Sequence, residues 1–211
     1  MPFGAHESME THEMLEAKIC MIDHFSFYAS QCQDETLRNL IQNHLQRVMQ
    51  SYNQLLTYTH SYQVAKPMMN QQASNVSPNQ IQYGLRSPQQ VAPQTNVQYF
   101  NDRQIAGAIL SAHKNSSKNH MAAALECADP NVRQMMMNGA VECCNMAYET
   151  FLYMNQKGYY QVPTLDSHTA KTMLHHYQPM NAMPHAGNQM NMPMNASQGM
   201  PHSIPMNPNY Q

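Results

Sequence analysis

A short pattern that occurs twice constrains the fold of this chain more than any other feature. The two copies read QCQDETLRNLIQNH at 31–44 and ECADPNVRQMMMNG at 126–139, and they lie 95 positions apart. Cys, Asp, Arg and Asn recur at the same places in both copies. This spacing is typical of a joint between two helices, in which the first helix ends near the Cys and the Asp caps the next helix. In the second copy, Pro130 follows the capping Asp129 at the first helical position, where a missing N–H has no cost.

Residues on both sides of each joint follow the period of an amphipathic helix. Before the first joint the predicted inward positions are Leu15, Ile19, Ile22, Ser26 and Ala29. After it they are Leu37, Ile41, His44, Val48, Tyr52 and Leu55. Around the second joint they are Ile105, Ile109, Ala112, Ser116, Ala123 and Cys127, then Val132, Met136, Gly139, Cys143, Ala147 and Thr150. Gly158 is the predicted C-terminal cap of the last of these helices.

The pattern predicts an all-α protein made of two repeated helical hairpins. A single hairpin cannot bury its apolar face, so the two hairpins should pack together as a four-helix bundle. The connector between them, roughly 35 residues, is too long for adjacent antiparallel helices and favours an end-to-end crossover, as in ferritin-like bundles. The predicted organisation is a first hairpin at 1–62, a Pro/Gln-rich crossover linker at 63–100, a second hairpin of the same bundle at 101–163, and a tail at 164–211.

Charge and hydropathy exclude several classes of function. Only 11% of the residues are charged and the net charge is −2, so there is no electrostatic case for binding nucleic acid or an anionic membrane. No apolar run approaches the roughly 20 residues that a membrane span requires. The N-terminus MPFGAHESME lacks the basic and apolar regions of a signal peptide. We therefore expect the protein to be made and folded in a cytoplasm.

The C-terminal tail is uncharged from Thr172 to Gln211 and rich in Met, Asn and Pro. Such a segment can bury little apolar surface in a regular element, so the tail is predicted to be disordered and self-associating. An alternative is a copper-binding module, because Met thioethers and His can hold Cu(I). The candidate ligands are Met190, Met192, Met194, His185 and His202.

A ferritin-like bundle prompts a search for a two-metal centre, which uses Glu-x-x-His on two of the helices. No Asp or Glu in this chain has a His three positions later. His44 lies on an inward face and is interpreted as a hydrogen-bonded core residue, with a degenerate site at His44, His113 and Glu142 as the metal-binding alternative. We assign no catalytic, cofactor-binding or metal-binding residue, and no enzyme signature or small-molecule substrate is evident.

The five cysteines are an odd number without any CxxC pair, which favours reduced thiols that act as small buried residues. They are Cys20, Cys32, Cys127, Cys143 and Cys144. Oxidative cross-linking through these thiols and through tyrosines is a further hypothesis. The tyrosines considered are Tyr159, Tyr160, Tyr177 and Tyr210.

Two stretches of the chain resemble the coat F family of Bacillus-type spore coat proteins. The first is NDRQIAGAILSAHKNSSKNHMAAALECADPNVRQMMMNG, which is followed by FLYMNQKGYYQVP. The second, in the N-terminal half, is HEMLEAKICMIDHFSFYASQCQDETLRNLIQNHLQ. The residues that carry the resemblance in the second hairpin are Asn101, Asp102, Arg103, Lys114, Glu126, Pro130, Arg133, Tyr153, Met154, Gly158, Tyr160 and Pro163.

This resemblance implies a ferritin-like helical domain, expression during endospore formation and a structural place in the proteinaceous coat. The implied partners are other coat proteins, together with self-association, and the implied location is the mother-cell cytoplasm followed by the spore coat. The resemblance implies no catalytic or metal residues. The long crossover and the Met/Asn-rich tail depart from the simple family pattern.

Overall fold

The computed structural model describes residues 4–61, 80–87 and 90–180. Within these ranges the chain forms five helices and no strand. The helices are α1 (Ala5–Gln31), α2 (Glu35–Ser61), α3 (Asp102–Glu126), α4 (Pro130–Gln156) and α5 (Ser167–Leu174). The chain divides into two compact units, Met1–Thr164 and Leu165–Gln211. In the described part, no helix is both long and apolar enough to cross a membrane.

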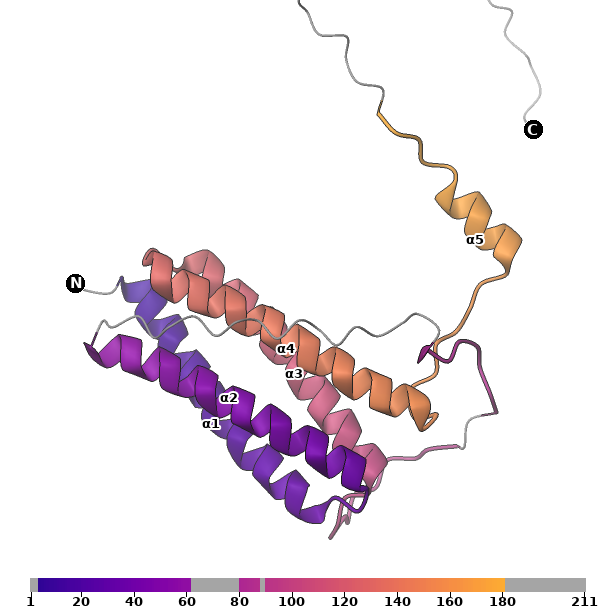
Figure 1. Ribbon diagram of the computed structural model, residues 1–211, viewed down its shortest axis with the longest axis horizontal. Coiled ribbons are helices and arrows are strands. Elements are labelled where there is room, and N and C mark those ends of the chain that lie inside the picture. Colours follow the sequence, from indigo (N-terminus) through magenta and orange to yellow (C-terminus); the bar gives the residue numbers. More distant parts are fainter. Residues whose placement is uncertain (1–3, 62–79, 88–89, 181–211) are drawn as a thin grey trace, which may run out of the picture. The chain divides into compact units, whose positions relative to one another are not determined.

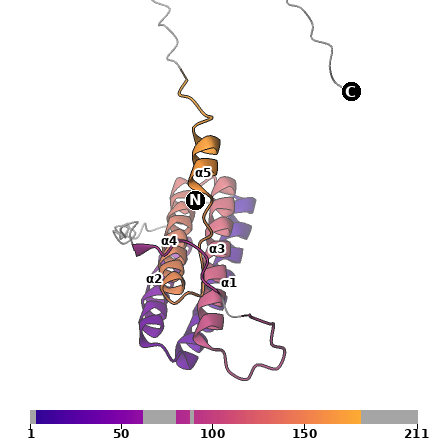
Figure 2. The ribbon, with the colours of Figure 1, turned by 90° about the vertical axis from the view of Figure 1, so that its right-hand side faces the viewer.

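The first unit is an antiparallel four-helix bundle, as predicted (Figures 1 and 2). α1 packs against α2 and α3, and α4 packs against α3 and α2. The start of α3 meets the end of α1, where Asp102 accepts a hydrogen bond from the N–H of Gln33 (2.9 Å). At the opposite end of the bundle, Tyr58 of α2 donates to Asp129 before α4 (2.7 Å). α2 therefore ends far from the start of α3, which confirms the end-to-end crossover.

Each joint between helices is capped by a carboxylate of the other hairpin. Asp102, in the first turn of α3, accepts hydrogen bonds from the backbone N–H groups of residues 33–34 (2.9 and 3.1 Å). Glu7, in the first turn of α1, accepts them from the N–H groups of residues 128–129 (3.0 and 2.7 Å). Glu7 and Asp102 also lie 95 positions apart, so the repeat includes the residues that cap its joints. Glu7 is buried in this position, with an exposure of 3%.

The helix ends carry the predicted caps. Oδ1 of Asp129 accepts hydrogen bonds from the N–H groups of Asn131 (2.7 Å) and Val132 (3.2 Å), and Pro130 takes the first helical position. α4 ends in a Schellman motif, in which the N–H of Tyr159 donates to the carbonyl of Met154 (2.8 Å). Gly158 provides the required left-handed residue, with φ +75°.

The core confirms the predicted inward faces of α2 and α4 and corrects that of α1. All six positions predicted for α4 are buried, and five of the six for α2. On α1, however, the buried residues are Glu7, Thr11, Met14, Lys18, Met21 and Phe25, whereas Ile19 is exposed. The observed face is shifted by one residue from the predicted one. It contains charged side chains that bind partners inside the bundle, and hydropathy alone does not identify such a face.

The middle of the crossover linker is attached to the end of α4 by Asn155, which is buried. Its side-chain oxygen accepts from the N–H of Gln82 (2.8 Å), and its amide donates to the carbonyls of Gln82 and Tyr160 (both 3.0 Å). The N–H of Gly84 donates to the carbonyl of Val162 (2.9 Å). Isolated β-bridges pair Val162 with Tyr83 and with Gly84. These contacts fix the route of residues 80–87 along the bundle.

The second unit contains α5, within the segment predicted to be a disordered tail. Asp166 caps this helix by accepting hydrogen bonds from the N–H groups of His168 (2.9 Å) and Thr169 (3.3 Å). No residue of α5 is buried. The predicted disorder of residues 181–211 lies outside the described residues, and so do the candidate copper ligands and Tyr210.

Candidate functional site

The most polar part of the bundle interior is a chain of hydrogen bonds that joins α3, α2 and α4. Nε2 of His113 lies 3.1 Å from Nδ1 of His44, and Nε2 of His44 lies 2.9 Å from the carboxylate of Glu149. Both imidazoles have no exposed surface, and their rings meet edge to face with centroids 4.8 Å apart. Removal of any member would leave a buried polar group without its partner, so this chain favours one arrangement of the three helices.

The order of these contacts determines the tautomers. An ionised Glu149 only accepts, so Nε2 of His44 carries the hydrogen and Nδ1 of His44 accepts from Nε2–H of His113. Nδ1 of His113 is then a bare acceptor, and it is buried without a hydrogen-bond partner in the described part of the chain. Burial lowers the pKa of His44, although the hydrogen bond to Glu149 acts in the opposite direction. Burial, with the nearby His44 and Arg47, lowers the pKa of His113 well below its usual value. Both rings are therefore neutral at pH 7.

Arg47 joins this chain to a second carboxylate. Its guanidinium bonds to both oxygens of Glu149 (2.9 and 3.0 Å) and to Glu142. The Arg47 side chain is only 10% exposed. Burial acts to raise the pKa of Glu149, but the hydrogen bonds from His44 and Arg47 outweigh this effect and hold the pKa below its usual value. One guanidinium therefore lies between two ionised carboxylates in a partly dehydrated site.

A second polar group lies beside the first: the Lys18–Ser51 bond connects α1 to α2, and a bond from Sγ of Cys143 to the Ser116 hydroxyl (3.4 Å) connects α4 to α3. Lys18 is buried and donates to the hydroxyl of Ser51 (2.9 Å). Desolvation lowers the pKa of this lysine. On α3, Nδ1 of His120 bonds to the carbonyl of Ser116 (2.8 Å), while its Nε2 is buried and has no hydrogen-bond partner among the residues that the structure describes.

Gly139 on α4 allows His120 to occupy its position. A Cβ on residue 139 would lie 2.7 Å from Nε2 of His120 and would collide with the ring. Gly139 lies 95 positions after His44 and is its equivalent in the repeat. The first hairpin therefore has a large side chain at this position, and the second hairpin has no side chain there.

A space of about 10 Å³ lies beside these side chains and is lined by some of them, together with apolar residues. This volume is sufficient for roughly one water molecule and for no organic substrate. Its lining includes Lys18, Arg47, Ser51, Ser116, Glu142 and Cys143. The polar side chains of the interior therefore bond to one another and link the helices.

The degenerate site suggested by the sequence is only partly assembled. His44 and His113 do meet, but Glu142 turns to Arg47 and Glu149 takes its place beside His44. No group of three or more His, Cys, Asp or Glu side chains in the described residues has the geometry to hold a metal ion. Two signals could have revealed Glu149: it lies seven residues after Glu142, on the same helical face, and Arg47 lies three residues after His44.

The five cysteines are all free, but they are not all buried as predicted. Cys32 and Cys143 are buried and Cys127 is half-buried, whereas Cys20 and Cys144 are exposed. Of the described tyrosines considered for cross-linking, Tyr159 is half-buried, and Tyr160 and Tyr177 are exposed.

Comparisons with known proteins agree with this architecture. Residues 101–163 match the model of the Coat F domain. Over 181 residues the chain is 29% identical to the spore coat protein F-like protein YhcQ of Bacillus subtilis (strain 168), a match that covers 83% of this chain and 81% of that protein. The crystal structure of a candidate spore coat protein from Bacillus halodurans C-125 has the same fold, with a TM-score of 0.58 and 20% identity over 79% of this chain and 97% of that one. The second hairpin therefore carries the match to the Coat F domain, and the chain is similar to a spore coat protein F-like protein over most of its length.

Proposed function

We propose that this protein is a structural component of the bacterial endospore coat. The observation that supports this most strongly is the match to the Coat F domain, together with a relative named as a spore coat protein F-like protein along most of its length. The interior of the bundle agrees with a structural role, because its polar side chains bond to one another beside a space of about 10 Å³.

In this proposal the two parts of the chain have different tasks. The hairpins at 1–62 and 101–163 form the stable folded unit, a ferritin-like bundle. The linker at 63–100 and the tail at 164–211 make the contacts with other coat proteins and with further copies of this chain. Residues 67–98 hold a single charged residue, Arg86, and residues 172–211 hold none, so neighbouring chains would not repel one another. Exposed aromatic side chains at Tyr99, Tyr160 and Tyr177 offer additional apolar contacts.

The proposed course is synthesis in the mother-cell cytoplasm during sporulation, followed by deposition on the developing spore. No catalytic step is needed for this role.

A fluorescent fusion expressed from the native promoter tests this proposal. The expected result is a signal that is absent from growing cells, appears in the sporulating mother cell and then surrounds the spore. A fusion that lacks residues 164–211 should fold but give a weaker and more diffuse signal around the spore. Constant expression in growing cells, with no enrichment on purified spores, would contradict the coat assignment.

A further inference from the structure

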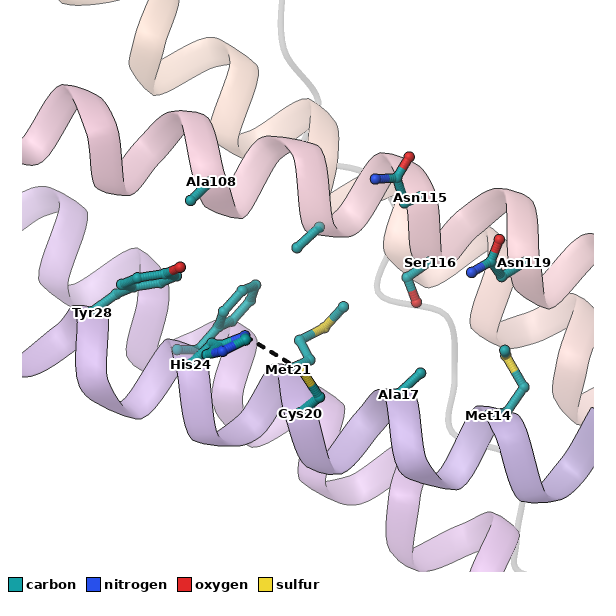
Figure 3. A pocket seen from close by; sticks show the side chains of 12 residues that line it. Met14, Ala17, Cys20, Met21, His24, Tyr28, Ala108, Asn115, Ser116 and Asn119 are labelled. Carbon is teal, nitrogen blue, oxygen red and sulfur yellow. Dashed lines mark hydrogen bonds between the residues drawn. The ribbon is translucent and has the colours of Figure 1, made fainter. Parts of the chain in front are cut away.

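An open groove of about 310 Å³ runs between α1 and α3, apart from the buried polar group (Figure 3). Its apolar lining residues are Met14, Ala17, Met21, Phe25, Ala108 and Ala112. The lining also includes Asn115 and Asn119 of α3, and no Asp, Glu, Lys or Arg. An uncharged molecule with an apolar group therefore suits this groove better than an ion does.

Cys20 and His24 lie together on the α1 side of this groove. They are four residues apart and project from the same face of the helix, with Sγ of Cys20 3.5 Å from Nδ1 of His24 (Figure 3). The His24 ring stacks on Tyr28 with centroids 6.1 Å apart, which orients it toward the thiol. An imidazole at this distance can take the proton of the thiol and leave the nucleophilic thiolate.

The other four thiols lack this combination of exposure and a neighbouring base. Burial and the Asp102 carboxylate raise the pKa of Cys32 to about 12. Burial and nearby carboxylates raise the pKa of Cys127 to about 11, and burial also raises that of Cys143. Cys144 is exposed, but no imidazole among the described residues is bonded to it. Cys144 is therefore a matched control for Cys20 in the same molecule.

We propose that Cys20 is a thiol–disulfide exchange site that reacts with an uncharged disulfide whose apolar group lies in the α1–α3 groove. His24 takes the proton from Sγ of Cys20, and the thiolate attacks one sulfur of the disulfide. A bond forms between Cys20 and that sulfur while the original S–S bond breaks. The second sulfur leaves as a thiolate and takes the proton back from His24, so the products are a mixed disulfide at Cys20 and one free thiol. This inference goes beyond the coat assignment and does not depend on it.

The first test measures the reaction of the full-length protein with 2,2′-dithiodipyridine, an uncharged aromatic disulfide, at pH 7. The Cys144→Ser variant reports on Cys20, the Cys20→Ser variant reports on Cys144, and the double variant gives the background of the buried thiols. An ordinary thiol is only a few per cent thiolate at pH 7, so a neighbouring base can raise the rate about 10-fold. We expect Cys20 to react at least about 10-fold faster than Cys144. A smaller difference would overturn the proposal.

The second test separates the roles of His24 and the groove. His24→Gln should remove most of the rate advantage of Cys20 without changing the free energy of unfolding or the rate at Cys144; an unchanged rate at Cys20 would contradict the role of His24. Ala17→Phe, at an exposed position on the groove wall, should slow the reaction with 2,2′-dithiodipyridine several-fold. It should leave the reaction with the smaller bis(2-hydroxyethyl) disulfide unchanged. Equal slowing of both probes would overturn the groove as the recognition element.

Discussion

The internal repeat is symmetric at the two ends of the bundle and asymmetric in its interior. At the ends, equivalent residues do the same work: Glu7 and Asp102 each cap the joint of the other hairpin. In the interior, equivalent positions hold different side chains, and Arg47 bonds directly to Glu142, its equivalent at the offset of 95.

This difference has a physical reason. The two joints lie far apart, and each exposes the same backbone N–H groups, so the same carboxylate suits both. In the centre the equivalent positions face each other, and two identical charges there would repel. Opposite charges, such as those of Arg47 and Glu142, attract each other. The repeat can therefore be symmetric at its ends and must be asymmetric in its core.

The largest effect is expected from removing the charge at the centre. Arg47→Met leaves Glu142 and Glu149 without their shared cation in a partly buried site. We expect the free energy of unfolding, measured by urea denaturation, to fall by about 3 kcal/mol. Arg133→Met, at an exposed position on α4, is the control and should change it by less than about 0.5 kcal/mol. Similar small effects for both variants would show that the central ion pair does not stabilise the fold.

Removing either cap should have the next largest effect, and the two effects should match. Glu7→Ala and Asp102→Ala each leave the two backbone N–H groups of a joint without their carboxylate, at an expected cost of about 2 kcal/mol. Glu7→Ala also removes the acceptor of the Gly4 N–H at the start of α1. The two caps lie at opposite ends of the bundle, so the double variant should lose the sum of the two values. Glu13→Ala, at an exposed position of α1, is the control. A large loss of stability for one of the two variants and none for the other would contradict the equivalence of the two caps.

Replacing two glycines of the second hairpin by alanine should change the free energy of unfolding in opposite directions. Gly139→Ala forces a methyl group against His120 and should lower the free energy of unfolding by about 1.5 kcal/mol. Gly107→Ala, within α3, meets no atom within 4 Å and should raise it by about 0.5 kcal/mol. Combining Gly139→Ala with His120→Ala should cost less than the sum of the two single changes. Simple additivity would contradict the close approach of residue 139 and the ring.

The last prediction concerns the pH dependence of stability. Burial, helped by the charge of Lys18, lowers the pKa of His120 to about 4, below its value of about 6.5 in an unfolded chain. Between these values the unfolded state binds a proton that the folded state does not, so stability falls as the pH falls from 6.5 toward 4. His120→Gln should reduce this slope by about 1 kcal/mol per pH unit between pH 5 and 6, as measured by urea denaturation at each pH. An unchanged slope would mean that His120 does not titrate in this way.

Sequence patterns predicted the bundle well because its joints and two of its helices follow simple rules. The caps at Asp129 and Gly158 and the inward faces of α2 and α4 depend on local chemistry and on apolar period. The face of α1 could not be predicted in the same way, because Glu7 and Lys18 are buried only when their partners on other elements are present. The role of Glu149 was missed because its partner His44 lies 105 residues away on another helix, whereas the search considered pairs within one helix.

Amide hydrogen exchange most directly tests the claim that each hairpin caps the joint of the other. In the intact protein, the N–H groups of residues 33–34 and 128–129 should exchange slowly. Glu7→Ala should accelerate exchange only at 128–129, and Asp102→Ala only at 33–34, each at least about 10-fold. Acceleration at the joint within the same hairpin as the substitution, or no acceleration at either joint, would contradict the account.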